Sequence, residues 1–490
     1  MNIYNLIHSM SKGDKRHFSL YSRSQGIKSK QYVRLYDMIL QQNKFDEKEL
    51  KIQIGDKYYA QLKYELCKHI LESLRRNHHK TDKSSTLLTI DNAHVLLNNG
   101  LWKDALKQLK KVFNTQHPIQ SNTAFLAFSD TSYIKSRYST NEVLLETIES
   151  WDQRKTEIIE LFDIETSYDK LYMKIMLINQ EMESVRKPQD KKRLHDYLED
   201  TLLQEPEYSK SKYAELNFHY CNGLARYLLG EYENSQSHMA SVKNILDTEY
   251  SIRLNREDLY LRVLANLSLC ALQNNKITEA TSYRKELCNY DSLYAANDSY
   301  KIYLTDLLEL MICNASNKYK KSFDVISNQL SRSIKHKPQY RLTQEHTYQI
   351  FQTVTSYMEL GLFKDAKKTI LSFITENKKS SKKDAYSYAR IVLLIVLIEE
   401  NNSDLLDFEL RSVNRYLKLE NQLFLFEKII LDFTNKLIQN NSGAARKKIY
   451  RNLSLEIEKL KKSPFERNAF VYFDFDKWAK KKAMKHTDIN

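Results

Sequence analysis

Apolar residues along this chain recur mainly at the three- and four-residue spacing of an α-helix. Within residues 57–76, for example, Tyr58, Leu62, Leu66, Ile70 and Leu74 follow one another at intervals of four. This spacing places them on one face of a helix, whereas a strand would alternate apolar and polar residues. No stretch of the sequence shows sustained alternation, so the pattern predicts an all-α protein.

The composition also favours helices over sheets. Only 8 glycines and 5 prolines occur among 490 residues, well below ordinary usage. Sheet proteins need many more of these residues in their turns, whereas long helices need few. Capping boxes mark several expected helix starts, as at Ser11 with Asp14 and at Asn255 with Asp258.

A recurring six-residue corner divides the helical pattern into hairpins. Its form is Gly or Asn, any residue, a large apolar residue, two further residues, and then Ala or Ser. It occurs at 100–105, 230–235, 275–280, 317–322 and 361–366, ending in Ala105, Ser235, Ala280, Ser322 and Ala366. Gly or Asn permits the left-handed backbone that ends a helix, and the small residue lets the second helix approach the first. A small residue also precedes three of the corners by seven positions, at Ala93, Gly223 and Ser268.

The spacing of the corners predicts a repeat architecture. The last four corners are 45, 42 and 44 residues apart, and 130 residues separate the first two. Such corners are typical of tetratricopeptide (TPR) units, whose usual period is 34. We therefore expect an all-α, right-handed α-solenoid of TPR-like helical hairpins with a period of about 42–45.

Four regions follow from this interpretation. Residues 1–80 form a basic N-terminal helical region, with helices expected near 2–9, 12–24, 30–42, 46–54 and 56–78. Residues 81–215 hold degenerate helical hairpins, and 120–215 departs most from the repeat. Residues 216–442 form the TPR-like array, and 443–490 form a basic and aromatic pair of C-terminal capping helices.

The chain resembles a family of uncharacterised bacterial TPR-like helical-repeat proteins. The resemblance rests on segments near both ends: Lys15-Arg16-His17-Phe18 after Ser11, Tyr32 with Leu35, Tyr36 and Ile39, the helix from Leu62 to Arg76, and Tyr472-Phe473-Asp474-Phe475-Asp476-Lys477-Trp478. These motifs are structural in character. The resemblance implies the fold, and it brings no catalytic or binding residues with it.

Charge is unevenly distributed along the chain. The net charge is +14, with +8 over residues 1–80, −5 over 81–330 and +11 over 331–490. Basic ends are consistent with binding to nucleic acid or another anionic surface. The alternative is a general excess of Lys that accompanies the many Asn, Ile and Tyr residues of an AT-rich genome.

The sequence lacks the motifs of common catalytic and metal sites. It has no GxxxxGK[ST], GxGxxG, HExxH or GxSxG, and the adjacent His78 and His79 point to different sides of a helix. We therefore expect a non-enzyme without metal or cofactor. Triads that assemble from distant positions leave a cryptic enzyme as a weaker alternative.

The location is expected to be cytoplasmic. The five cysteines, at 67, 221, 270, 288 and 313, show no CxxC spacing, as is typical of reduced thiols inside a cell. The N-terminus has neither the basic nor the apolar region of a secretory signal. The longest apolar run, 391–398, has eight residues, whereas a membrane span needs about 20. We expect no membrane insertion.

The first candidate site is the inner face of the array, which the first helix of each hairpin lines in TPR proteins. The predicted register places seven residues there: Asn217, Tyr220, Tyr227, Arg262, Tyr348, Phe351 and Met358. They would bind a protein or peptide, such as an apolar, aromatic or helical segment. The alternative is that they pack between helices, where aromatic residues at helical spacing usually lie.

The second candidate site is basic. Two short helices around Gly55 could form a helix-turn-helix whose cations meet phosphates: Lys57, Lys63, Lys68, Arg75 and Arg76. The interpretation we favour is a basic capping hairpin, because a single Gly is a common helix stop.

A second basic set lies near the C-terminus, with Arg446, Lys447, Lys448 and Arg451 at its centre. Lys459, Lys461, Lys462 and Lys480–Lys482 continue it. The set could contact RNA, DNA or an acidic protein. The interpretation we favour is a solvated outer face on the last helices.

We expect a non-catalytic protein- or peptide-binding scaffold that uses the concave face of the array. The alternative is a nucleic-acid-binding or regulatory protein that uses its basic ends, with the array as a sensor or dimerisation arm. A homo-oligomer is compatible with either function.

Overall fold

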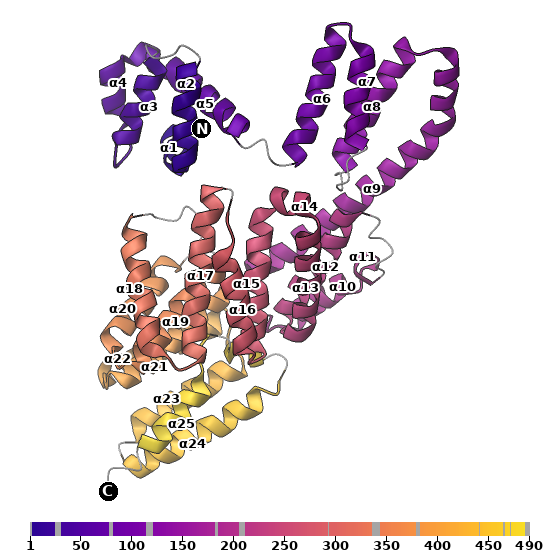
Figure 1. The fold of residues 1–490 in the computed structure, drawn as a ribbon. Helices are drawn as coiled ribbons and strands as arrows, with labels where there is room; N and C mark the ends of the chain where they lie inside the picture. Colours follow the sequence, from indigo (N-terminus) through magenta and orange to yellow (C-terminus); the bar gives the residue numbers. More distant parts are fainter. Residues whose placement is uncertain are drawn as a thin grey trace. The chain divides into compact units, whose positions relative to one another are not determined.

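The computed structural model describes residues 2–24, 31–77, 82–113, 121–181, 185–204, 211–292, 294–335, 344–378, 383–440, 442–463, 466–470 and 472–485. Within these residues the regular structure is helical throughout and contains no strand (Figure 1). The all-α prediction is therefore confirmed for the described part of the chain. The chain divides into two compact units. One comprises Met1–Ile159, Glu249–Asp258 and Tyr290–Tyr300, and the other comprises Glu160–Thr248, Leu259–Asn289 and Lys301–Asn490.

The first unit holds the N-terminal helices. They are α1 (Ile3–Ser9), α2 (Lys12–Ser24), α3 (Gln31–Gln41), α4 (Glu47–Ile54), α5 (Asp56–Asn77), α6 (Asp82–Asn98), α7 (Trp102–Phe113), α8 (Ser121–Tyr138) and α14 (Tyr250–Asn255). The helix α9 (Asn141–Glu181) begins in this unit and continues into the other. The first five helices start and end within one residue of the bounds that the sequence predicts.

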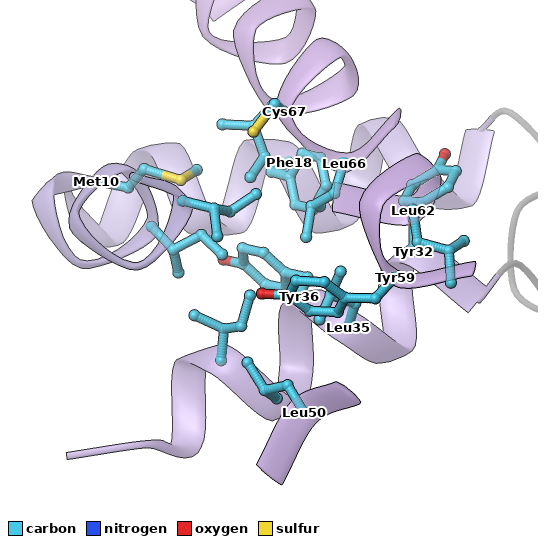
Figure 2. Packing of buried hydrophobic residues seen from close by; sticks show 14 of the residues in the cluster. Met10, Phe18, Tyr32, Leu35, Tyr36, Leu50, Tyr59, Leu62, Leu66 and Cys67 are labelled. Atoms are coloured by element: carbon cyan, nitrogen blue, oxygen red, sulfur yellow. The ribbon is translucent and has the colours of Figure 1, made fainter. Parts of the chain in front are cut away.

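Helices α1–α5 share one apolar core (Figure 2). Phe18 of α2, Tyr36 of α3 and Leu66 of α5 are among its fully or almost fully buried residues. On α5 the buried face begins at Tyr59, whereas Tyr58 is exposed. Our prediction of Tyr58 on this face is wrong because a helix of 3.6 residues per turn drifts away from a strict four-residue repeat.

The second unit holds most of the remaining helices. They are α10 (Pro188–Leu198), α11 (Thr201–Gln204), α12 (Lys212–Leu228), α13 (Tyr232–Thr248), α15 (Glu257–Gln273), α16 (Ile277–Asn289), α17 (Ala295–Ala315), α18 (Tyr319–Lys335), α19 (Gln344–Glu359), α20 (Phe363–Glu376), α21 (Lys383–Glu399), α22 (Ser403–Leu419), α23 (Leu425–Gln439), α24 (Gly443–Leu460), the 3-10 turn η2 (Arg467–Phe470) and α25 (Phe475–Lys485). The first residues of α15 and α17 belong to the other unit.

The five predicted corners share one backbone geometry. Each leading residue has a positive φ: 79° at Gly100, 76° at Gly230, 58° at Asn275, 58° at Asn317 and 76° at Gly361. The amide after it donates back to the carbonyl five residues earlier, as in Leu101 N to Leu96 O at 2.9 Å and Lys276 N to Ala271 O at 2.8 Å. This is the Schellman arrangement, which satisfies carbonyls that the helix end would leave unpaired.

The small residue at the end of each corner is fully buried. Ala105, Ser235, Ala280, Ser322 and Ala366 have no solvent exposure. On the preceding helix Ala93 and Ser268 are also buried, and a Cβ atom added to Gly223 would lie 2.8 Å from the Met239 Cε atom. Small residues therefore meet where the paired helices cross, as the sequence predicts.

Two further corners escaped the sequence pattern. Asn401, between α21 and α22, has a φ of 54°, and Asn421, between α22 and α23, has a φ of 52°. Gln422 N donates to Leu417 O at 2.9 Å, which repeats the Schellman arrangement. The pattern missed both corners because the buried residue five positions after the Asn is large, Leu406 in one corner and Phe426 in the other.

The stretch 120–215 contains helices, but its described residues hold no corner of the recurring type. It consists of α8, the 41-residue α9 and the short helices α10 and α11. The buried side chains of α9 in the second unit, such as Tyr168 and Ile175, join those of α10 and α12 in one cluster. The long α9 thus takes the place that regular hairpins would occupy.

Candidate partner-binding surfaces

The seven residues predicted to line the inner face lie within the packing of the second unit. Asn217, Tyr220, Tyr348, Phe351 and Met358 are buried, and Tyr227 and Arg262 are half-buried. The hydroxyl groups of Tyr227 and Tyr348 form a hydrogen bond of 2.8 Å, which joins α12 to α19. The burial of five of these residues and the Tyr227–Tyr348 hydrogen bond favour the alternative interpretation, in which they pack between helices.

The C-terminal aromatic segment packs directly against part of this set. The ring of Tyr472 lies 5.1 Å from the rings of both Tyr348 and Phe351, and 5.3 Å from that of Tyr388. Phe475 is fully buried, and its ring lies 5.0 Å from that of Phe426 on α23. The C-terminal segment thus covers these aromatic residues from within the same chain.

Helix α25 continues this segment and is anchored by polar contacts. The Trp478 Nε1 group donates to Glu399 Oε1 at 2.7 Å, and Lys482 pairs with the other oxygen of Glu399 at 2.7 Å. Lys481 pairs with Glu359 at 2.6 Å. Glu359 and Glu399 are the last residues of α19 and α21, where the helix dipole disfavours a negative charge. The lysines of α25 offset that charge.

Lys480, one of the cations that continue the C-terminal basic set, also forms ion pairs within the chain. It pairs with Glu458 at 2.8 Å and with Asp476 at 3.0 Å. The hydrogen bonds that the Lys480 ammonium group donates to these two carboxylates raise its pKa. Lys461 also lies 3.5 Å from Asp476. Lys480, Lys481 and Lys482 of α25 therefore each form an ion pair within the chain.

A buried ionic cluster lies near the same segment. Arg186, just before α10, donates to both oxygens of Glu427 on α23, at 2.5 and 3.0 Å, and to Glu466 at 2.7 Å. Burial lowers the pKa of the Arg186 guanidinium, but the two carboxylates outweigh that effect and raise it. All three side chains are nearly inaccessible to solvent. One guanidinium thus bridges two carboxylates, and the cluster holds distant segments of the chain together.

Glu466 has a second role in this cluster. Its carboxylate accepts hydrogen bonds from the backbone amides of Leu425 at 3.1 Å and Phe426 at 3.2 Å. These amides belong to the first turn of α23, whose N-cap residue Phe424 provides no side-chain cap. Glu466 therefore caps α23 from a distant part of the sequence.

Of the N-terminal basic candidates, two form ion pairs and three others are exposed. Lys63 pairs with Glu47 at 3.1 Å, and Arg76 pairs with Glu72 at 2.8 Å. Lys57, Lys68 and Arg75 are exposed on α5. Gly55 separates α4 from α5 with a φ of 96°, so two helices do flank it.

Along α5 the exposed cations share a face with an exposed aromatic residue. Lys57, Tyr64, Lys68 and Arg75 are spaced by seven, four and seven residues, which places them on one side of the helix. The Tyr64 side chain is 71 % exposed. A face of this kind can contact phosphates and also stack on a base.

The C-terminal basic candidates lie in the first half of α24. Lys448 and Arg451 are exposed, and Arg446 and Lys447 are half-buried. Helix α24 packs against α23 and α25. Cations at the start of a helix oppose its dipole, so this placement does not stabilise α24.

Several large apolar side chains are exposed on α6, α8 and α9. They include Leu87, Leu88 and Val95 on α6, Phe125, Leu126, Tyr133 and Tyr138 on α8, and Val143, Leu145, Ile148, Ile159 and Phe162 on α9. Single exposed apolar residues are ordinary on protein surfaces, whereas contiguous patches of them are typical of interaction sites. The pattern that predicts degenerate hairpins in 81–215 does not indicate which of their apolar residues stay exposed.

No group of three or more His, Cys, Asp or Glu side chains in the described residues could hold a metal ion. Two histidines do lie close together, His219 on α12 and His238 on α13, whose Nδ1 atoms are 3.1 Å apart. Burial lowers the pKa of both imidazoles, to about 4 for His238. The distance is that of a hydrogen bond between two neutral rings.

A comparison with models of known protein families finds no match, and no curated protein matches the chain at a significant level. A search for membrane-spanning segments within the described residues finds no helix that is both long and apolar enough.

Proposed function

We propose that the chain is a non-catalytic scaffold that binds a protein or peptide, and that its hairpins continue as a right-handed, TPR-like α-solenoid with a period of about 42–45. The five corners support a repeat, because they share a positive φ and a buried small residue. Repeat arrays of helical hairpins commonly present extended binding surfaces.

The observation that carries the proposal is the exposed apolar surface of α8. Phe125, Leu126 and Tyr133 are each about half exposed, at spacings that place them toward one side of the helix. Burying such side chains against a partner contributes roughly 25 cal/mol for each Å² removed from water. By contrast, the predicted inner-face residues Tyr348 and Phe351 already contact Tyr472.

A capture experiment with matched variants tests this proposal. Full-length protein and the variant Phe125→Ser/Tyr133→Ser are used as bait, with Phe408→Ser, an exposed apolar residue of α22, as the control. We expect a saturable partner that the wild type and the control retain and the double variant loses. The proposal fails if no saturable partner binds, or if the double variant binds as well as the wild type. Circular dichroism verifies that all three proteins are folded.

An alternative function, nucleic-acid binding, is favoured by the exposed face of α5. Lys57, Lys68 and Arg75 would contact phosphates, and Tyr64 would stack on a base. Titration of a fluorescent single-stranded or duplex oligonucleotide at rising salt decides it. A slope near zero in log K against log salt, or no binding at roughly 50–100 mM salt, excludes this function. Lys57→Glu/Lys68→Glu/Arg75→Glu should abolish binding, whereas Lys107→Glu on α7 should not.

A further inference from the structure

One helix carries an exposed stripe with an unusual symmetry. Along α9 the residues Leu145, Ile148, Asp152, Lys155, Ile159 and Phe162 are spaced alternately by three and four. These are the a and d positions of a heptad, which form the contact seam between two helices. The four apolar members are 60, 66, 45 and 46 % exposed in chain order, and Asp152 and Lys155 are also exposed.

The stripe is distinct from the line that α9 uses for packing within the chain. Leu144, Thr147 and Trp151 are half-buried, and Ile158 is buried. The Trp151 ring lies 4.7 Å from that of Phe128 on α8, and Lys135 of α8 donates to Thr147 at 3.2 Å. Helix α8 packs against Thr147 and Trp151, whereas the residues at the a and d positions are exposed to solvent.

The order of residues in the stripe reads the same in both directions, apart from the sign of its two central charges. From either end it runs apolar, apolar, charged, charged, apolar, apolar, and its midpoint falls between Gln153 and Arg154. In an antiparallel pair of such helices each a position faces a d position of the other helix. Leu145 would face Phe162, Ile148 would face Ile159, and Asp152 would face Lys155.

We propose that α9 pairs with α9 of a second copy of this chain, antiparallel and across a two-fold axis at the stripe's midpoint. The proposal rests on the proposed binding function and names one partner for it. Four apolar layers close the seam, and two Asp152–Lys155 pairs form at its centre. A two-fold interface requires such a self-complementary surface.

The central charges select the antiparallel arrangement. In a parallel pair Asp152 would face its own counterpart and Lys155 would face its own, so that like charges meet inside the seam. In the antiparallel pair both contacts join opposite charges. The cost lies at the two ends, where Glu142 of one helix approaches Asp163 of the other in solvent that screens the repulsion.

Sedimentation equilibrium of the full chain tests the association. We expect a monomer–dimer equilibrium at micromolar concentration, which Ile148→Asp weakens by at least about tenfold because the change occurs twice in the seam. The control Phe408→Asp alters an exposed apolar residue on α22 and should leave the equilibrium unchanged. A wild-type chain that stays monomeric up to roughly 100 μM would overturn the proposal.

Charge exchange tests the pairing itself. Asp152→Lys alone and Lys155→Asp alone should each weaken the dimer, and the double variant Asp152→Lys/Lys155→Asp should restore it. A surface charge effect unrelated to the seam would not be rescued by the exchange. Failure of the double variant to recover overturns the proposal, provided that circular dichroism shows a folded protein.

Spin labels at position 142 report the orientation. Cys288 is the exposed cysteine among the five, so Glu142→Cys is made in a Cys288→Ser background. Antiparallel helices place the two labels about 35 Å apart along the axis, and parallel helices place them about 10–15 Å apart. A short distance refutes the antiparallel pair. Loss of the dimer with capture through α8 intact refutes this inference alone and leaves the proposed function in place.

Discussion

The hydroxyl of Ser235 on α13 donates a hydrogen bond of 2.8 Å to the backbone carbonyl of Gly223 on α12. The two residues stand 12 positions apart, and Ser268 and Ala280 repeat the relationship in the next hairpin with the donor on the other helix, at 2.9 Å. A hydroxyl can reach a carbonyl of the neighbouring helix only where neither side chain holds the two backbones apart. The contact therefore marks the crossing point of each hairpin.

A larger side chain at the crossing should open the hairpin. Gly223→Val would force its side chain into Met239, since even a Cβ atom lies 2.8 Å from Met239 Cε. We expect a loss of about 1–3 kcal/mol in the free energy of unfolding, from overpacking between the two helices. Urea denaturation measures it. Gly443→Ala, which meets no atom within 4 Å, is the control and should be neutral or slightly stabilising.

The left-handed corners should tolerate Asn better than Ala. Gly361 has a φ of 76° and no atom within 4 Å of an added Cβ, so the cost of Gly361→Ala comes from backbone strain alone. We expect a loss of about 1–2 kcal/mol for Ala and a smaller loss for Asn, as Asn275 and Asn317 occupy the same conformation. Thermal unfolding compares the two variants, and equal losses would contradict this account.

One substitution in the buried ionic cluster should destabilise the protein more than two substitutions together. Arg186→Met leaves Glu427 and Glu466 buried without their cation, and we expect a loss of about 3–5 kcal/mol. In Arg186→Met/Glu427→Gln one of these buried charges is also removed, so the double variant should be the more stable of the two. Chemical denaturation at neutral pH gives both values, and the reverse order would argue against a buried charge as the cause.

The stability of the protein should depend on Trp478 of α25 far more than on Lys481. Trp478 is buried, and its ring contacts those of Phe433 and Tyr450, at 5.8 and 5.5 Å. Trp478→Ala should therefore cost about 3–5 kcal/mol of stability. Lys481→Ala removes a partly exposed ion pair with Glu359 and should change stability by less than about 1 kcal/mol. Comparable losses in the two melting curves would disprove this ranking.

The paired histidines should make the protein sensitive to mild acid. Burial lowers the pKa of His219 and, with His219 and Arg226 nearby, that of His238 to about 4. The unfolded chain therefore binds more protons below pH about 6.5, so stability is full above that pH and falls toward pH 4. Glu215 opposes the shift at His219.

Replacement of one ring tests this pH dependence. Because His238 is partly exposed, we expect only about 1–2 kcal/mol of its contribution to be lost as the pH falls from 6.5 to 4.5. His238→Gln should flatten the change in unfolding free energy across that window. An unaltered slope in the variant would assign the acid sensitivity to other groups.

The helices and their corners were readable from local sequence. Gly or Asn at a corner and Ala or Ser five residues later act within their own hairpin. The contacts that they make join residues only about 12 positions apart, as in Ser235 and Gly223. For that reason the positive φ values at Gly100 and Asn275 and the burial of Ala105 and Ala280 follow from the pattern. The corners at Asn401 and Asn421 end in Leu406 and Phe426, and the same pattern could not recognise them.

The candidate sites depended on contacts that no local pattern contains. Tyr348 and Phe351 have the spacing of surface and interior residues alike, and only the fold brings Tyr472, more than 100 residues away, against them. The same holds for Arg186, whose partners Glu427 and Glu466 lie 241 and 280 residues further along the chain. Lys480 has one acidic partner four residues away on its own helix, Asp476, but its second partner Glu458 and the partner of Lys482, Glu399, lie on other helices.

By itself the sequence determined that this protein is helical, where most of its hairpins turn and which small residues lie at their crossings, since backbone conformation and steric fit act over neighbouring turns. Only the tertiary structure decided which aromatic residues are covered, which charges are neutralised and which apolar face of α9 stays open. Burial and ion pairing depend on which distant segments meet, and that follows from the packing of the whole unit and not from the order of residues in any one helix.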